Sequence, residues 1–334
     1  MNLKDKLKYI GNSNQLWSVR HYELTDGWAR KMRAFDVHAG NGLQYTVLPD
    51  RGMDISLASY KGTNLAYLTC NGETNPAYYE PEGIGWLHTF GGGLLTTCGL
   101  THLGPPSVDD GETLGLHGRY STIPARQVAD CSSWIGDEYQ IKLKGIVEEG
   151  YLFGNKLRLE REIVSTVGKN EIEITDTITN FGNKPSPYTI LYHINLGYPL
   201  LSDKAELEIN PQETFARDET AVSGMDEFRN FTEPQEQYDE QVFFHKMKGN
   251  QEGLAQASLL NKELGIRLNV SFNVNQLPFL AEWKMMGHGE YVLGLEPANV
   301  FVKSRKQLRE EGSLPFLKPQ ESLKNKVVIS IEEV

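Results

Sequence analysis

The sequence is short of cysteine, of long apolar runs and of positive charge, and each shortage excludes a class of protein. Its three cysteines, among 334 residues, are widely spaced and odd in number, which fits neither a disulfide framework nor a CxxC metal site. We therefore expect Cys70, Cys98 and Cys131 to be small buried apolar residues in a reducing compartment. The first residues, "MNLKDKLKYIGN", hold no apolar stretch long enough for a signal peptide or a membrane span.

The charge balance and the missing leader together predict the location and partners of the chain. The formal net charge is −11, which argues against nucleic acid or an anionic membrane as a partner. We expect a cytoplasmic protein with no membrane partner, present as a monomer or as a homodimer formed through exposed strand edges.

Strand-forming and aromatic residues are abundant. Fifteen tyrosines, thirteen phenylalanines, five tryptophans and thirty-two glycines favour strands, turns and the flat aromatic surfaces on which sugars bind. Helical patterns are short, at 3–10 and 304–312, and the acidic segment 211–240 is expected to cross one face of the molecule. The pattern predicts an all-β fold, a large antiparallel β-sandwich, and without repeats or linkers we predict a single domain over residues 1–334. The predicted strands fall within 43–62, 139–150, 156–168, 170–182, 266–274, 290–302 and 325–334.

Two histidines stand in segments that favour a ligand site. His117, in "GLHGR", lies in a glycine-framed turn with Arg119 beyond it, which would leave the imidazole accessible; an ordinary turn histidine is the alternative interpretation. His193 follows an apolar strand in "YTILYHINLGYPLL", and Asn195 and Gly197 share its face because residues two apart point the same way. This polar strip on an apolar strand indicates a pocket, although a hydrogen-bonded core histidine fits the same pattern.

A single carboxylate interrupts the apolar strand "YVLGLEPANVFV". Glu296 would cost several kcal/mol if it were buried there without compensation. An edge-strand glutamate in water is the alternative, which the apolar flanks disfavour. We therefore interpret Glu296 as a functional carboxylate.

The segments "GLHGR", "YHINLG" and "LEPAN", in this order, resemble the aldose 1-epimerase (galactose mutarotase-like) superfamily. Together with "LPDRGMDI" and "EWKMMGHGEYVLGLEPAN", they look closer to a less characterised branch than to galactose mutarotase itself. The resemblance implies a supersandwich of antiparallel strands with a sugar cleft on one broad face. It also implies catalytic roles for His117, His193 and Glu296, with no cofactor and no metal.

The resemblance extends less clearly to substrate-binding residues. The family's sugar-binding aspartate has its only counterpart in "EQYDEQVFFH", as Asp239 or Glu240, and its early arginine could be replaced by Arg51 or Arg119. Lys284 is a further candidate, and Asn195 completes the set. Two or three basic side chains at the cleft would suit a sugar that carries a carboxylate, phosphate or sulfonate.

The chemistry of such an enzyme follows from moving two protons. Exchange of sugar anomers removes a proton from the anomeric hydroxyl and adds one to the ring oxygen, so it needs one base and one acid, which we expect on opposite sides of the ring. Carboxyl and imidazole groups, with reference pKa values of about 4.3 and about 6.5, suit these roles. We assign Glu296 as the base for the anomeric hydroxyl and His193 as the acid for the ring oxygen. His117 is expected to hydrogen-bond the oxygen on which charge develops.

Two other functions fit the same residues. Two histidines and one carboxylate could form a facial metal site in a metal-dependent sugar isomerase or oxygenase, although His-x-His spacing is absent. A non-catalytic carbohydrate-binding protein would use the aromatic residues and Asn195 without needing an acid and a base. We predict the epimerase-like isomerase and keep these two as alternatives.

Overall fold

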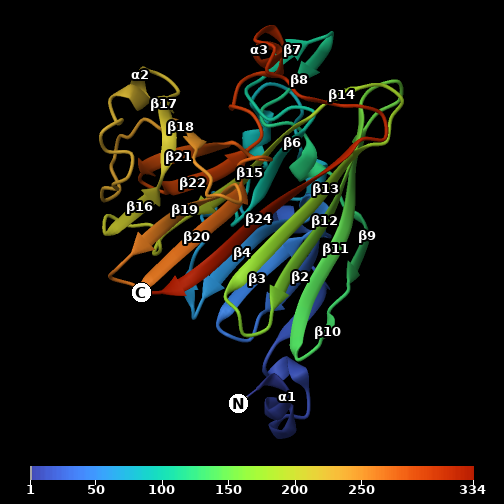
Figure 1. Ribbon diagram of the computed structural model, residues 1–334, viewed down its shortest axis with the longest axis vertical. Coiled ribbons are helices and arrows are strands. Elements are labelled where there is room, and N and C mark those ends of the chain that lie inside the picture. Colours follow the sequence, from blue (N-terminus) through green and yellow to red (C-terminus); the bar gives the residue numbers. More distant parts are fainter. Residues whose placement is uncertain (1) are drawn as a thin grey trace.

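Antiparallel β-sheets make up most of the computed structural model, which describes residues 2–334 (Figure 1). The largest sheet has nine strands in the spatial order β10-β11-β12-β13-β24-β20-β19-β16, with β9 also pairing with β11. Their bounds are Arg126–Asp130 (β9), Ser133–Ile135 (β10), Glu138–Gly150 (β11), Lys156–Thr166 (β12), Glu171–Asn180 (β13), Ala205–Ile209 (β16), Leu254–Asn261 (β19), Ile266–Asn273 (β20) and Ser322–Glu333 (β24).

Two further sheets lie against it. The five-stranded sheet runs in sequence order through Ser18–Glu23 (β1), Arg33–His38 (β2), Leu43–Leu48 (β3), Asp54–Tyr60 (β4) and Thr63–Asn64 (β5). The six-stranded sheet has the order β17-β18-β21-β22-β15-β6. Its strands are Thr96–Leu100 (β6), Thr189–Leu196 (β15), Pro211–Ala216 (β17), Gln241–Met247 (β18), Phe279–Gly287 (β21) and Glu290–Ala298 (β22).

The remaining elements are short. Two small ribbons pair Ser107–Asp109 (β7) with Glu112–Leu114 (β8) and Ser186–Pro187 (β14) with Phe316–Leu317 (β23). The α-helices are Leu3–Lys6 (α1), Glu219–Val222 (α2) and Arg305–Glu310 (α3), and the 3₁₀ turns are Leu7–Tyr9, Ser13–Gln15, Gly27–Ala29, Pro49–Arg51, Pro76–Tyr78, Gly85–His88 and Tyr120–Thr122. Helix α3 begins in a capping box, in which Ser304 and Gln307 satisfy each other's backbone N–H groups.

The burial pattern explains why the strands form two layers. In β13 every second residue is buried and the others are half-exposed, so one face packs inward and the other meets water. One large core cluster joins residues from all three sheets, among them Val47, Ile163 and Ile194. In β15 every residue is buried, because the six-stranded sheet is covered on its outer face as well. That second covered face is where a site can be enclosed.

The predicted fold class is confirmed: the chain is an antiparallel β-structure with few, short helices. The cysteine prediction is correct only for Cys98, which is buried in the six-stranded sheet; Cys70 and Cys131 are exposed. Segment 211–240 is not a plain excursion, since it contains β17 and α2. It runs along the edge of the six-stranded sheet, at the upper left of Figure 1.

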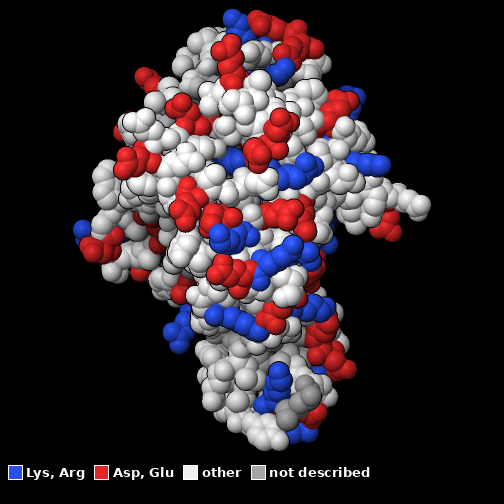
Figure 2. Space-filling model, turned by 90° about the vertical axis from the view of Figure 1, so that its left-hand side faces the viewer, with Lys and Arg blue, Asp and Glu red and all other residues white. Residues whose placement is uncertain are grey.

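The surface carries charges of both signs. On the face shown in Figure 2, basic and acidic side chains are intermixed, with no broad field of either sign. Within residues 2–334, no helix is long and apolar enough to cross a membrane.

Candidate functional site

A cleft of about 910 Å³, including space open to solvent, lies on the outer face of the six-stranded sheet. Sites for small organic ligands are typically concave and lined mainly by apolar side chains with a few polar groups. The polar lining of this cleft consists of His117, His193, Arg217, Glu240 and Glu296. The rest of the lining is apolar or aromatic.

Strand register brings the two central groups together on the cleft floor. Leu191 pairs with Ala298 and Ile194 pairs with Leu295, so His193 of β15 lies opposite Glu296 of β22. His193 Nε2 and Glu296 Oε1 are 3.2 Å apart, and both side chains are about 95% buried. The two groups predicted to act as acid and base therefore lie side by side, which differs from the expected placement on opposite sides of a sugar ring.

Gly294 makes room for the Glu296 carboxylate. The two residues share a face of β22, and Gly294 is flanked by Trp283 of β21 and Asn195 of β15. A Cβ at position 294 would lie 2.4 Å from Glu296 Oε1 and 3.0 Å from the Trp283 Cβ. The missing side chain lets the carboxylate lie over the backbone between two strands.

Burial keeps this pair in its uncharged form. Desolvation, assisted by the neighbouring His117, lowers the pKa of His193 to about 3. Desolvation, assisted by the negative charge of Glu240, raises the pKa of Glu296 well above its usual value. At neutral pH Glu296 is thus protonated and His193 is neutral.

His117 reaches the same cleft from a strained turn. Its backbone φ of 57° is left-handed, and Gly118 follows it at 75°. Its Nδ1 lies 2.8 Å from the Leu103 carbonyl oxygen, which can only accept, so Nδ1 carries the proton and Nε2 is left as an acceptor. Burial lowers its pKa, and its ring centroid is 5.9 Å from that of His193.

Aromatic rings surround the histidine pair. Trp86 stacks on Phe90 with centroids 4.4 Å apart and meets His117 edge-on at 4.7 Å. Phe90 and Trp283 each lie 5.4 Å from the His193 ring. Such walls exclude water from the acid–base pair and offer flat faces to a ring-shaped ligand.

An ion pair lies at the mouth of the cleft. Arg217 donates through Nη1 to Glu240 at 2.8 Å and through Nε to Asp218 at 2.7 Å. The other Glu240 oxygen accepts from the Trp283 indole at 2.9 Å. Of the two acidic candidates, Glu240 lines the cleft, whereas Asp239 is exposed and does not.

The structure does not bring the other predicted substrate-binding residues to the cleft lining. Arg119 is exposed outside it. Lys284 follows Trp283 and so points to the opposite face of the sheet, where its ammonium donates to the Glu227 carbonyl at 2.8 Å. Asn195 is fully buried beneath the floor, donating to the carbonyls of Gly93 and His193.

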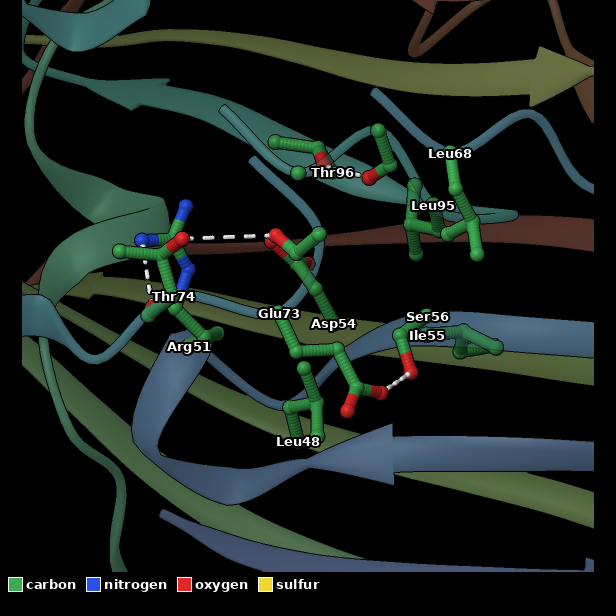
Figure 3. Close-up of a pocket in the computed structure, with 13 residues that line it drawn as sticks. Leu48, Arg51, Asp54, Ile55, Ser56, Leu68, Glu73, Thr74, Leu95 and Thr96 are labelled. Carbon is green, nitrogen blue, oxygen red and sulfur yellow. Dashed lines mark hydrogen bonds between the residues drawn. The ribbon is translucent and has the colours of Figure 1, made fainter. Parts of the chain in front are cut away.

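Arg51 belongs to a different, smaller cavity. Figure 3 shows its guanidinium beside Thr74, in a cavity also lined by Asp54 and Glu73. It donates to the Thr74 carbonyl at 3.2 Å, and burial lowers its pKa to about 10. None of the three basic residues invoked for an acidic sugar therefore lines the cleft.

Four residues of the site were not predicted from the sequence: Arg217, Trp86, Phe90 and Gly294. Arg217 lies in the acidic segment, and its role depends on an ion pair across the β17–β18 ribbon, which no local pattern reveals. The aromatic pair precedes a run of three glycines in "GWLHTFGGG", a signal of close backbone approach that could have marked it.

The alternative of a metal-dependent enzyme requires a set of ligands with suitable geometry. Among residues 2–334, no group of three His, Cys, Asp or Glu side chains is placed to hold a metal ion.

Comparisons with known proteins place this geometry in a family. A family described as a domain of unknown function (DUF4432) matches residues 29–331. No curated protein matches the sequence. A crystal structure of a "putative aldose 1-epimerase" from Klebsiella pneumoniae is similar over 96% of this chain and 86% of that chain, with 26% identity and a TM-score of 0.90.

More distant structures share the fold. A galactose mutarotase-like protein from Clostridium acetobutylicum matches 96% of this chain and 100% of its own at 13% identity and a TM-score of 0.65. A galactose 1-epimerase from Lactobacillus acidophilus matches 95% of this chain and 99% of its own at 14% identity and a TM-score of 0.60. The resemblance to the galactose mutarotase-like superfamily, and with it the predicted supersandwich, is confirmed.

Proposed function

The chain belongs to the family described as a domain of unknown function (DUF4432), and we propose that it is an isomerase that interconverts the anomers of a cyclic sugar. The observation that carries the proposal is the buried His193–Glu296 pair, 3.2 Å apart on the floor of an aromatic cleft. We treat residues 1–334 as one functional domain, needing no cofactor.

The pair suits the two oxygens that must exchange protons. The anomeric hydroxyl and the ring oxygen are bonded to the same carbon, so neighbouring acid and base groups can reach both. Glu296, which burial keeps protonated, protonates one oxygen while neutral His193 accepts the proton of the other. The sequence-based assignment began with Glu296 as the base and His193 as the acid, which is the opposite protonation state. During ring opening and closing, each of the two groups passes through its protonated and its deprotonated form.

The surrounding residues lower the cost of these transfers. His117 Nδ1 already donates to the Leu103 carbonyl, so its Nε2 can only accept, and we assign it to accept a hydrogen bond from the sugar oxygen that has gained a proton. Trp86, Phe90 and Trp283 keep the site dry, which strengthens each hydrogen bond inside it.

The direct test measures the rate of anomer exchange by polarimetry and one-dimensional NMR. The sugars tested are neutral, phosphorylated and acidic. We expect the protein to accelerate exchange of at least one sugar, with no loss after dialysis against a chelator. Because the pKa of His193 is lowered to about 3, kcat/KM should be nearly unchanged between pH 7 and pH 5. An unperturbed histidine would lose about 30-fold in its neutral form over that range. On the alkaline side kcat/KM should fall as Glu296 loses its proton.

Three results would contradict the proposal in different ways. Binding without acceleration would indicate the carbohydrate-binding module, and activity lost to the chelator would indicate the metal-dependent enzyme. A loss of about 30-fold between pH 7 and pH 5 would contradict the neutral pair.

Gly294→Ala should lower kcat by about tenfold or more while the protein stays folded. The new methyl group would lie 2.4 Å from Glu296 Oε1 and so displace the carboxylate, and ångström-scale misplacement of a catalytic group has effects of this size or larger. Steady-state exchange kinetics with circular dichroism measure both effects. Gly287→Ala is the control, since its Cβ would meet only the flexible Met285 methyl; equal kcat losses in the two variants would remove the positioning role of Gly294.

A further inference from the structure

The composition of the cleft narrows the substrate class. Resting on the proposed function, we propose that the sugar is uncharged and lacks the hydroxyl at C6, as in a 6-deoxyhexose. The inference comes from the charges at the cleft, the polar groups available there and the side chains next to the acid–base pair.

The charge at the cleft leaves nothing to receive an acidic substituent. Arg217 is the single cation of the lining, and it is already paired with Glu240 and Asp218. Glu296 and Glu240 both face the cleft, and both histidines are held neutral by burial. A carboxylate or phosphate would meet the charged carboxylate of Glu240 and no unpaired cation, so binding it would leave a buried charge uncompensated.

Polar partners for distant hydroxyls are equally scarce. Of the fifteen residues that line the cleft, five are polar, and three of these are committed to the anomeric and ring oxygens. Each oxygen of Glu240 already accepts one hydrogen bond, from Arg217 or from the Trp283 indole, and keeps one lone pair for a hydroxyl at the mouth. Arg217 Nη2 is the remaining rim donor, enough for one or two hydroxyls at the mouth.

The wall nearest the catalytic pair is apolar. Ala281 of β21 is directly opposite Glu296, and Phe244 of β18 is directly opposite Ala281, so both share the cleft face with the pair. Phe90 and Trp283 lie on either side of His193.

Sugar geometry assigns C6 to this wall. The carbon that bears C6 is bonded to the ring oxygen, so C6 lies close to whichever group protonates that oxygen. A hydroxyl there would lose water and find no partner, whereas a methyl group would pack on Ala281, Phe244 and the aromatic rings.

The experiment compares sugars that differ only at C6. We expect kcat/KM for D-fucose and for 6-deoxy-D-glucose to exceed the values for D-galactose and D-glucose by at least about fivefold, the cost of one buried unpaired hydroxyl. D-Galacturonate and glucose 6-phosphate should be exchanged more slowly than either parent hexose.

A matched pair of variants tests whether the apolar wall at Ala281 sets the preference for 6-deoxy sugars. Ala281→Ser adds a hydroxyl beside the pair and should reduce the 6-deoxy to parent ratio, while Ala281→Cys adds a group of similar size without that polarity and should leave it nearly unchanged.

The outcomes separate the two proposals. If no sugar is exchanged above its spontaneous rate, the proposed function fails. If exchange is enzymatic but the parent hexoses or acidic sugars equal or exceed the 6-deoxy sugars, the function stands and the substrate inference is overturned. An equal fall of the ratio in both Ala281 variants would show that size, not polarity, sets the preference, and would also overturn it.

Discussion

Glu296→Gln is expected to lower kcat for anomer exchange at least about a hundredfold while leaving sugar affinity within a fewfold of wild type. The amide keeps the shape and burial of the carboxyl group but cannot carry the proton that the pair shares with the substrate. Loss of one general acid–base group typically costs 10²–10⁴-fold, and a hundredfold corresponds to about 2.7 kcal/mol of transition-state stabilisation. Polarimetry measures the exchange rate and NMR titration the affinity.

The structure offers a control for this variant on the same strand. Glu290, at the start of β22, is exposed and outside the cleft, so Glu290→Gln should exchange sugar at the wild-type rate. Glu296→Gln should also lose the alkaline decline of kcat/KM expected for the wild type, because that decline reports the Glu296 proton. A Glu296→Gln protein with nearly wild-type kcat would refute the acid–base assignment.

The sequence predicted the fold and three residues of the cleft because those features leave a local trace. The isoleucines of β13 alternate along the sequence, as its buried residues do. An isolated glutamate in the apolar strand β22 indicates that other groups offset the cost of burying it. The convergence of His117, His193 and Glu296 was inferred from resemblance to a family. No pattern within the three segments could show that they meet.

Several residues predicted to bind substrate lie outside the cleft lining. Whether a residue reaches the cleft depends on which face of its strand it occupies and on contacts with residues far away in the sequence. Lys284 is one residue from Trp283, and that single step sends it to the opposite face of the sheet. Arg51 is the last residue of the 3₁₀ turn Pro49–Arg51, and its side chain lies in the cavity of Figure 3. Arg217 reaches the cleft because β17 pairs with β18, which positions it beside Glu240, and this contact is set by tertiary structure alone.

A second large effect, on the free energy of unfolding, is expected from substitutions in the buried ion cluster centred on Arg161, which lies behind the cleft. Its guanidinium donates to Asp54 at 2.8 Å and to Asp176 at 2.7 and 2.8 Å, and the Tyr192 hydroxyl donates to Asp176 at 2.8 Å. The cluster joins β12 and β13 of the nine-stranded sheet to β4 and β15, and Tyr192 immediately precedes His193. It therefore anchors β15, the strand that carries His193.

Arg161→Met should lower the free energy of unfolding by about 3–5 kcal/mol, the usual cost of leaving buried charges without their partner. Burial raises the pKa of Asp54 to about 6 even with the opposing Arg161, and removing the cation raises it further. The folded variant then binds more protons than its unfolded chain, so its stability falls as pH rises and its deficit should be larger at pH 8 than at pH 5. Urea unfolding at the two pH values measures both effects.

Two further variants separate the lost charge pairing from the lost packing. Arg158→Met removes a half-exposed arginine of the same strand, paired with Glu148, and should cost about 1 kcal/mol or less. Adding Asp176→Asn to Arg161→Met removes one stranded carboxylate, so the double variant should recover part of the lost stability. If Arg161→Met cost no more than Arg158→Met, or if its deficit did not change with pH, the aspartates would not depend on Arg161. The anchoring of β15 would then have to come from apolar packing alone.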